Sequence, residues 1–98
     1  MRRAAKVDGN HVATRDHLRA TGWGVRSTAA LGDDFPDFAV ARDGFTCLLE
    51  LKTGNKRLTL GQALFDAYWP GVIVKANSPQ EAEYLLALEY EFAKGHPL

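Results

Sequence analysis

A chain of 98 residues and 10.8 kDa fits a single domain, residues 1–98, that can bury one modest core without a disulfide or a structural metal. Its 46% hydrophobic and 24% charged residues exclude an intrinsically disordered chain. A single cysteine, Cys47, excludes an internal disulfide and is expected to be a buried apolar residue. Twelve basic residues balance twelve acidic ones, so overall basicity gives no argument for nucleic-acid binding.

The charges are nevertheless unevenly distributed along the chain. Residues 1–26 contain six basic and two acidic side chains, and residues 51–58 contain three basic and no acidic ones. Residues 33–50, between these segments, contain five acidic side chains and one basic side chain. Basic segments around an acidic centre are typical of a phosphate-binding surface around a metal site, although scattered solvated charges explain the same counts equally well.

The sequence contains no signal for a membrane. No apolar run approaches the ~18 residues that a membrane-spanning helix needs. The first ten residues, MRRAAKVDGN, lack the apolar stretch of a secretory signal peptide. We therefore expect a cytoplasmic protein that does not associate with a membrane.

The first predicted element is a helix over residues 10–20. Asp8 or Asn10 is its candidate N-cap, and Gly22 is its stop signal. A short strand over residues 23–27 follows, and a polar, glycine-containing turn then leads to the next apolar segment.

Two further strands are predicted over residues 37–41 and 45–52. They are separated by Asp43-Gly44, a strong signal for a tight hairpin turn, so they should pair antiparallel. Within the second of these strands, alternate side chains should point to the core and to the opposite face of the sheet.

The second predicted helix begins after Thr59, and Gln62 completes a capping box with it. Pro70 disfavours a helical conformation at the residue before it, so the helix should end at about residue 68. A short strand over residues 72–75 follows.

Ser78, Pro79 and Glu81 give the last helix an N-cap, a first-turn proline and a second capping box, and Gly95 closes it. Its core-facing residues are expected to be Ala82, Leu85, Leu86 and Phe92. The predicted order is therefore α-β-β-β-α-β-α, which favours an α/β or α+β fold with a hairpin-rich sheet covered by helices.

Three charged residues, Asp37, Glu50 and Lys52, are predicted to converge at one end of the hairpin. Asp37 lies six positions before Asp43 and Glu50 lies six positions after Gly44, so they should be opposite one another or nearly so. Two carboxylates ~4 Å apart repel by about 4 kcal/mol at an effective dielectric constant near 20, which a divalent cation would relieve. The alternative is that Lys52 simply forms an ion pair with Glu50 on an exposed face of the sheet.

The spacing Pro36-Asp37, twelve residues, then Glu50-Leu51-Lys52 resembles the signature of the PD-(D/E)XK nuclease superfamily. More narrowly, the chain resembles the small stand-alone VRR-NUC proteins that phages often encode. The further matching segments are Lys6-Val7-Asp8, Asn10, Leu18-Arg19, Gly22, Leu31-Gly32, Leu48-Leu49, Leu58-Thr59, Gln62, Phe65 and Trp69.

This resemblance implies a restriction-endonuclease-like αβββαβ core, with a mixed four-stranded sheet flanked by helices. It also implies that Asp37, Glu50 and the backbone carbonyl of Leu51 hold Mg²⁺ or Mn²⁺. Lys52 would orient or deprotonate the attacking water, and Gln62 would help to order the site. The capping box with Thr59 explains a glutamine at position 62 equally well.

The chain departs from the family pattern in one respect. Many relatives carry a glutamate in the first helix as a further metal ligand, whereas this chain has no glutamate before Glu50. Asp8 and Asn10 are the nearest substitutes, although such residues are more often helix caps.

The function implied by the resemblance is a metal-dependent endonuclease that cuts DNA, with a preference for branched, flapped or four-way (Holliday) junctions. A catalytically inactive DNA-binding module of the same fold is the alternative. Phosphate contacts are expected from four basic residues, Lys6, Arg15, Lys56 and Arg57. Paired cuts in a branched duplex require two sites, so we also expect a homodimer, with residues 65–69 and 84–92 as candidate contact segments.

Overall fold

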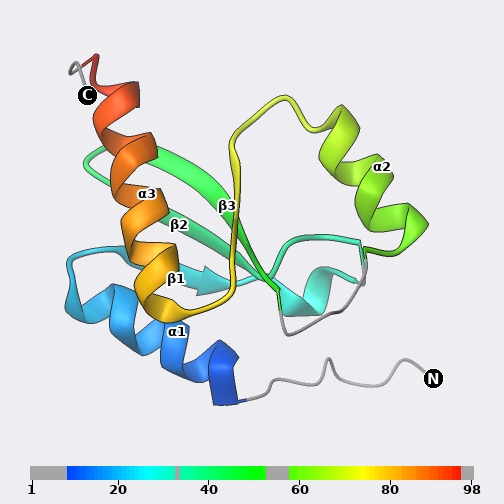
Figure 1. The fold of residues 1–98 in the computed structure, drawn as a ribbon, viewed down its shortest axis with the longest axis horizontal. Helices are drawn as coiled ribbons and strands as arrows, with labels where there is room; N and C mark the ends of the chain where they lie inside the picture. The colour runs from blue at the N-terminus through cyan, green and yellow to red at the C-terminus, as the bar shows by residue number, and fades with distance from the viewer. Residues whose placement is uncertain (1–8, 33, 53–57, 96–98) are drawn as a thin grey trace.

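The computed structural model describes residues 9–32, 34–52 and 58–95. These residues form three helices and four strands, with one 3₁₀ turn between the first two strands (Figure 1). In chain order they are α1 (Gly9–Ala20), β1 (Gly24–Ser27), the 3₁₀ turn η1 (Ala29–Leu31), β2 (Phe38–Arg42), β3 (Phe45–Leu51), α2 (Leu60–Tyr68), β4 (Ile73–Ala76) and α3 (Pro79–Ala93). The predicted order of helices and strands is confirmed, and no strand boundary differs by more than one residue.

The four strands form one mixed sheet in the order β1-β2-β3-β4. The first two pairings are antiparallel, and β3 pairs with β4 in parallel. The hairpin between β2 and β3 turns at Asp43 and Gly44, whose φ angles are +49° and +84°. Positive φ at both central positions is the requirement of a type I′ hairpin turn, which explains why Asp-Gly occurs there.

The two faces of the sheet are covered differently (Figure 1). Helices α1 and α3 pack against each other and against one face, where the core lies, whereas α2 stands apart on the other side and makes little backbone contact with the other described elements. The buried core residues are Leu18, Trp23, Val25, Phe38, Val40, Cys47, Leu49, Val74, Ala76, Ala82 and Leu86. Cys47 is thus a buried apolar residue, as predicted.

Local signals in the sequence account for most helix ends. The Thr59 side chain accepts from the backbone N–H of Gln62, and the Gln62 side chain accepts from the N–H of Thr59, so the predicted capping box of α2 is confirmed. Trp69 ends this helix in an extended conformation, as expected for the residue before Pro70. Gly95 closes α3 with a φ of +78°, also as predicted.

Two capping predictions need correction. The predicted second capping box forms only in part: Ser78 accepts from the N–H of Glu81, but the Glu81 carboxylate accepts from the N–H of Asn77 rather than that of Ser78. Asn10 lies inside α1, which begins at Gly9, and is therefore not the N-cap. The other candidate, Asp8, lies outside the described residues.

The prediction for the apolar side of α3 is also wrong in one position. Ala82 and Leu86 are fully buried, but Phe92 is 71% exposed. Tyr90 takes the inward place instead: its ring makes edge contacts with Trp23 and Phe45, and its hydroxyl donates to Asp43 at 2.6 Å. This hydrogen bond ties the end of α3 to the hairpin turn of the sheet.

Candidate active site at the end of the β2–β3 hairpin

The site is built around Asp37 and Glu50, which the antiparallel register places opposite each other. Phe38 of β2 pairs with Leu49 of β3, and continuing this register by one position puts Asp37 and Glu50 opposite each other, one on each strand. The main chain before β2 is held in place by Thr28, whose N–H donates to the Asp37 carbonyl at 2.8 Å and whose hydroxyl donates to the Pro36 carbonyl. The predicted convergence of the two carboxylates is therefore present.

The Asp37 side chain is fixed by the neighbouring strand. Its Oδ2 accepts a hydrogen bond from the backbone N–H of Leu51 at 2.8 Å. This contact takes up the free backbone donor at the end of β3 and orients the carboxylate toward the strand that carries Glu50. Both acidic groups belong to the face of the sheet that also carries Leu48, opposite to the core side chains of Cys47 and Leu49.

Glu50 lies in an environment that disfavours its ionised form. Partial burial is the largest cause, followed by the negative charges of Asp37 and Asp66, and together they raise the pKa of Glu50 to about 7. A hydrogen bond from the Asp37 backbone and the positive charge of Lys75 act in the opposite direction, lowering this pKa. A positive charge in addition to that of Lys75 would therefore stabilise the ionised form of Glu50.

Gln62 contacts both the N-terminus of α2 and the carboxylate of Glu50. Its Oε1 accepts from the N–H of Thr59 at 2.9 Å and so caps α2, while its Nε2 donates to Glu50 Oε2 at 3.5 Å. The second contact is a long hydrogen bond, at the limit of the accepted distance range. A glutamine suits this position because it carries an acceptor for the cap and a donor for the carboxylate at the same time.

Two residues that the sequence interpretation missed complete this cluster. Lys75 on β4 lies next to Glu50 in the parallel register, and its ammonium group forms an ion pair with Asp66 on α2. Asp66 comes one helical turn after Gln62, so both project from the same side of α2 toward the sheet. The four-residue spacing of Gln62 and Asp66 was a usable signal, whereas the position of Lys75 depends on strand pairing that no local pattern reveals.

Lys52 lies just beyond the end of β3. Its backbone N–H donates to the Ala76 carbonyl at 2.8 Å and continues the pairing with β4, while its side chain is exposed. In the part of the chain that the structure describes, no ion pair links the side chains of Lys52 and Glu50. The simple Glu50–Lys52 pair considered as an alternative is therefore absent, and Lys75 supplies the charge next to Glu50.

The donor set suits a hard divalent cation. Asp37 and Glu50 are carboxylates on neighbouring strands, and the Leu51 carbonyl is the backbone oxygen between Glu50 and Lys52. Such oxygen ligands match Mg²⁺ or Mn²⁺. Within residues 9–32, 34–52 and 58–95, no group of three or more His, Cys, Asp or Glu side chains is arranged to hold a metal ion. A cation here would thus rest on two carboxylates, the backbone carbonyl and water.

Of the further ligands predicted, Asp8 lies outside the described residues, and Asn10 lies in the first turn of α1. That helix packs on the opposite face of the sheet, where His11 contacts the ring of Phe38 at a centroid distance of 4.2 Å.

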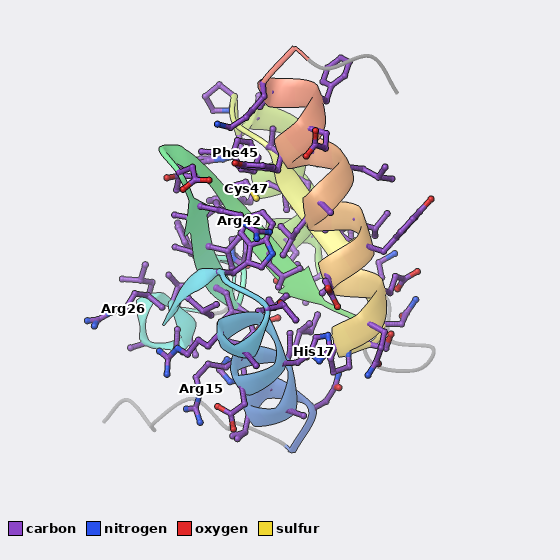
Figure 2. All side chains as sticks on the ribbon, turned by 90° about the vertical axis from the view of Figure 1, so that its left-hand side faces the viewer. Arg15, His17, Arg26, Arg42, Phe45 and Cys47 are labelled. Carbon is purple, nitrogen blue, oxygen red and sulfur yellow. The ribbon has the colours of Figure 1, made fainter. Side chains whose placement is uncertain are left out.

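Among the basic residues predicted to bind phosphate, the structure describes only Arg15. Its Nε donates to Asp16 at 2.9 Å, and its side chain is about one-third exposed. Figure 2 shows Arg15 and Arg26 projecting outward at the end of the molecule away from Phe45 and Cys47. Lys6, Lys56 and Arg57 lie outside the described residues.

Comparison with known proteins gives no relative from which a function could be transferred. The chain matches no protein-family model, no curated protein and no solved structure. Among the helices that the structure describes, none is long and apolar enough to cross a membrane. The described residues form an α/β fold with a mixed four-stranded sheet and three helices.

Proposed function

We propose that this chain is a Mg²⁺- or Mn²⁺-dependent endonuclease of the VRR-NUC type that hydrolyses DNA phosphodiester bonds. The observation that carries the proposal is the placement of Asp37 opposite Glu50, with the Asp37 carboxylate held by the Leu51 N–H. The sequence spacing of Pro36-Asp37 and Glu50-Leu51-Lys52 supports it further.

Each residue of the cluster has a distinct task in this proposal. Asp37, Glu50 and the Leu51 carbonyl would hold the cation, which when bound supplies a polarised phosphoryl oxygen and a water of lowered pKa. Gln62 orients the Glu50 carboxylate through its Nε2 donor. Lys52, exposed at the end of the strand, would orient the attacking water and offset negative charge that develops on the phosphate.

The burial of Glu50 is consistent with such a role. Two neighbouring carboxylates disfavour its ionisation in the free protein, so a divalent cation would gain binding energy by relieving their repulsion. The opposite charges of Lys75 and Asp66 offset each other in the ion pair beside Glu50. The repulsion between Asp37 and Glu50 therefore still needs a positive charge to relieve it.

The substrate is proposed to be branched, flapped or four-way DNA, cut by a homodimer. A short chain with few elements that could reach base edges favours recognition of backbone shape over sequence. Two cuts placed symmetrically in a junction require two sites, which an isologous pair provides.

The test is a cleavage screen on linear, flapped and four-way DNA with Mg²⁺, Mn²⁺, Ca²⁺ or a chelator present. We expect cleavage only with Mg²⁺ or Mn²⁺, and its loss in Asp37→Asn and Lys52→Ala. A wild-type protein that binds these substrates without cutting them would instead establish the alternative, an inactive DNA-binding module. A Lys52→Ala protein that cuts at the wild-type rate would contradict the proposed mechanism.

A further inference from the structure

Glu50 has a different charged neighbour on each side in the sheet. Asp37 lies opposite Glu50 when the antiparallel register is continued by one position, and Lys75 of β4 lies opposite it in the parallel register. The neighbours of Lys75 in its strand, Val74 and Ala76, are buried in the core. Lys75 therefore faces the other side of the sheet, together with Glu50. The strand order β2-β3-β4 places a carboxylate on one side of Glu50 and an ammonium group on the other.

The ammonium group of Lys75 is held in place by helix α2. It forms an ion pair with the carboxylate of Asp66, and the two side chains are 33% and 20% exposed. A partly buried pair is screened less by solvent than a surface pair, and removal of either member leaves the other charge uncompensated. The positive charge of Lys75 also acts on Glu50, whose pKa it lowers. A fixed positive charge is therefore part of the site before any metal ion binds.

A second metal ion would need ligands close to the first. Sites that cleave phosphodiesters with two metal ions hold them about 3.5–4 Å apart. The first ion of the proposed function would lie between Asp37 and Glu50, so a second would lie on the β4 side of Glu50. On that side, the described carboxylate that acts on the charge of Glu50 is Asp66, and it already pairs with Lys75. Among the described residues, no group of three or more acidic, histidine or cysteine side chains offers another set of ligands.

An ammonium group at this position opposes a second divalent cation in two ways. It occupies the carboxylate of Asp66, which would otherwise be a ligand, and its positive charge repels a cation placed beside it. The same charge supplies part of what a second cation would supply, because it offsets the negative charges of Asp66 and Glu50. Lys75 and a second metal ion are therefore alternatives at the β4 side of Glu50.

We propose, on the basis of the metal site of the proposed function, that the ammonium group of Lys75 takes the place of a second divalent cation. The site then binds one Mg²⁺ or Mn²⁺ ion per chain, between Asp37 and Glu50. Lys75 is a positioning residue in this arrangement, because it acts through the carboxylates of Glu50 and Asp66. It supplies in permanent form the positive charge that a second cation would bring to the β4 side of the site.

The experiment counts the Mn²⁺ ions that the protein binds without DNA. Calorimetry and electron paramagnetic resonance are used at pH 8, above the pKa of Glu50, which is about 7. We expect the wild type to bind one ion per chain and to give the spectrum of an isolated Mn²⁺ ion. Two ions about 3.5–4 Å apart couple magnetically and give a different spectrum, so a second ion in the site is distinguished from one bound elsewhere on the surface.

Three variants test whether Lys75 is what excludes the second ion. Lys75→Met removes the ammonium group and leaves Asp66 and Glu50 without a positive charge between them, so we expect a second, magnetically coupled Mn²⁺ ion to bind. Lys75→Arg keeps the charge and should bind one ion, like the wild type. Lys75→Met combined with Asp66→Asn also removes the ligand for the second ion and should return the count to one.

The matched control is Lys94→Met, which removes the same charge from an exposed lysine at the end of α3. It should bind one ion, which shows that losing a positive charge elsewhere does not create a second site. Loss of the Lys75–Asp66 ion pair removes a contact of α2, so the helix content of each variant is checked by circular dichroism. The count in the wild type decides the proposal even if Lys75→Met does not fold.

The possible outcomes separate this proposal from the nuclease proposal. Two coupled ions in the wild type, or a single ion in a folded Lys75→Met protein, overturn the role given to Lys75 and leave metal-dependent cleavage untouched. A wild type that binds no Mn²⁺ refutes the metal site and this role together. A wild type that binds one ion, gains a second in Lys75→Met and cuts no DNA refutes the nuclease function and leaves the role of Lys75 standing.

Discussion

The carboxylate of Asp37 accepts a hydrogen bond from the backbone N–H of Leu51, fourteen residues later in the chain. The contact crosses from the start of β2 to the end of β3 and holds one acidic group beside another, Glu50. Because a structural hydrogen bond and a negative charge reside in the same side chain, substitutions at position 37 can separate the two contributions.

Asp37→Asn keeps an acceptor for the Leu51 N–H but removes the charge. We expect its free energy of unfolding to equal or exceed that of the wild type, since repulsion with Glu50 is relieved. Metal-dependent cleavage should fall by about a hundredfold or more, the order expected when a metal ligand is lost. Chemical denaturation and single-turnover cleavage measure the two effects.

Asp37→Ala is the companion variant, because it also leaves the Leu51 N–H without its partner. A donor deprived of its acceptor costs about 1–3 kcal/mol, so this variant should be less stable than Asp37→Asn. Equal stability of the two would mean that the hydrogen bond contributes nothing to the fold.

Glu50 should make the metal-free protein less stable as the pH rises. Its pKa is about 7 in the folded state against an ordinary value of 4.5, so between these values the folded protein binds more protons than the unfolded one. Stability contributed by this group is therefore present at pH 4.5 and lost as the pH rises through 7. The carboxyl is partly solvated, which limits the effect to on the order of 1–2 kcal/mol.

The matched variant is Glu50→Gln, which stays neutral at every pH. Relative to the wild type it should gain stability at pH 8 and show little difference at pH 5. Urea denaturation at the two pH values, in the presence of a chelator, measures this difference. A constant difference between wild type and Glu50→Gln from pH 5 to pH 8 would contradict the raised pKa.

Lys75 and Asp66 should shift the titration of Glu50 in opposite directions. The positive charge of Lys75 lowers the pKa of Glu50, so Lys75→Met should raise it; Asp66 raises that pKa, so Asp66→Asn should lower it. The pKa can be followed by carbon NMR of the Glu50 side-chain carboxyl. Shifts of the same sign in both variants would show that they act by distorting the site rather than through their charges.

The sequence allowed the order of elements and most of their ends to be predicted, because those features depend on neighbouring residues. Three such features each depend on residues no more than four positions apart: the Thr59–Gln62 capping box, the Asp43-Gly44 turn and the helix stop at Pro70. The nearness of Asp37 and Glu50 followed from the same turn, since a two-residue hairpin fixes the register of the strands that it joins.

The remaining features depend on contacts between distant segments. The partner of β3 on its other side is β4, and only this parallel pairing brings Lys75 beside Glu50. Tyr90 is held inward, with Arg42 over its ring at 5.5 Å and Asp43 at its hydroxyl, while Phe92 is left outside. Helical periodicity could not distinguish these two aromatic residues, because both lie near the boundary of the buried side.

The side-chain amide of Gln62 makes two different contacts, one through Oε1 to Thr59 and one through Nε2 to Glu50. Substitutions at this position can therefore separate them. In Gln62→Glu the carboxylate can still accept from the N–H of Thr59 and keep the capping box, but it can no longer donate to Glu50 and adds a negative charge beside it. We expect unchanged helix content, a higher pKa of Glu50 and cleavage reduced by about tenfold or more at neutral pH.

Gln62→Ala removes both contacts and serves as the control. It should lose about 0.5–1.5 kcal/mol of stability, the net contribution of the one cap hydrogen bond removed, which Gln62→Glu should not. If Gln62 acts only as a cap, Gln62→Ala will cleave DNA at the wild-type rate and differ from the wild type in stability alone. Cleavage rates, thermal unfolding and the Glu50 titration, measured on the two variants side by side, therefore distinguish a positioning residue from a purely structural one.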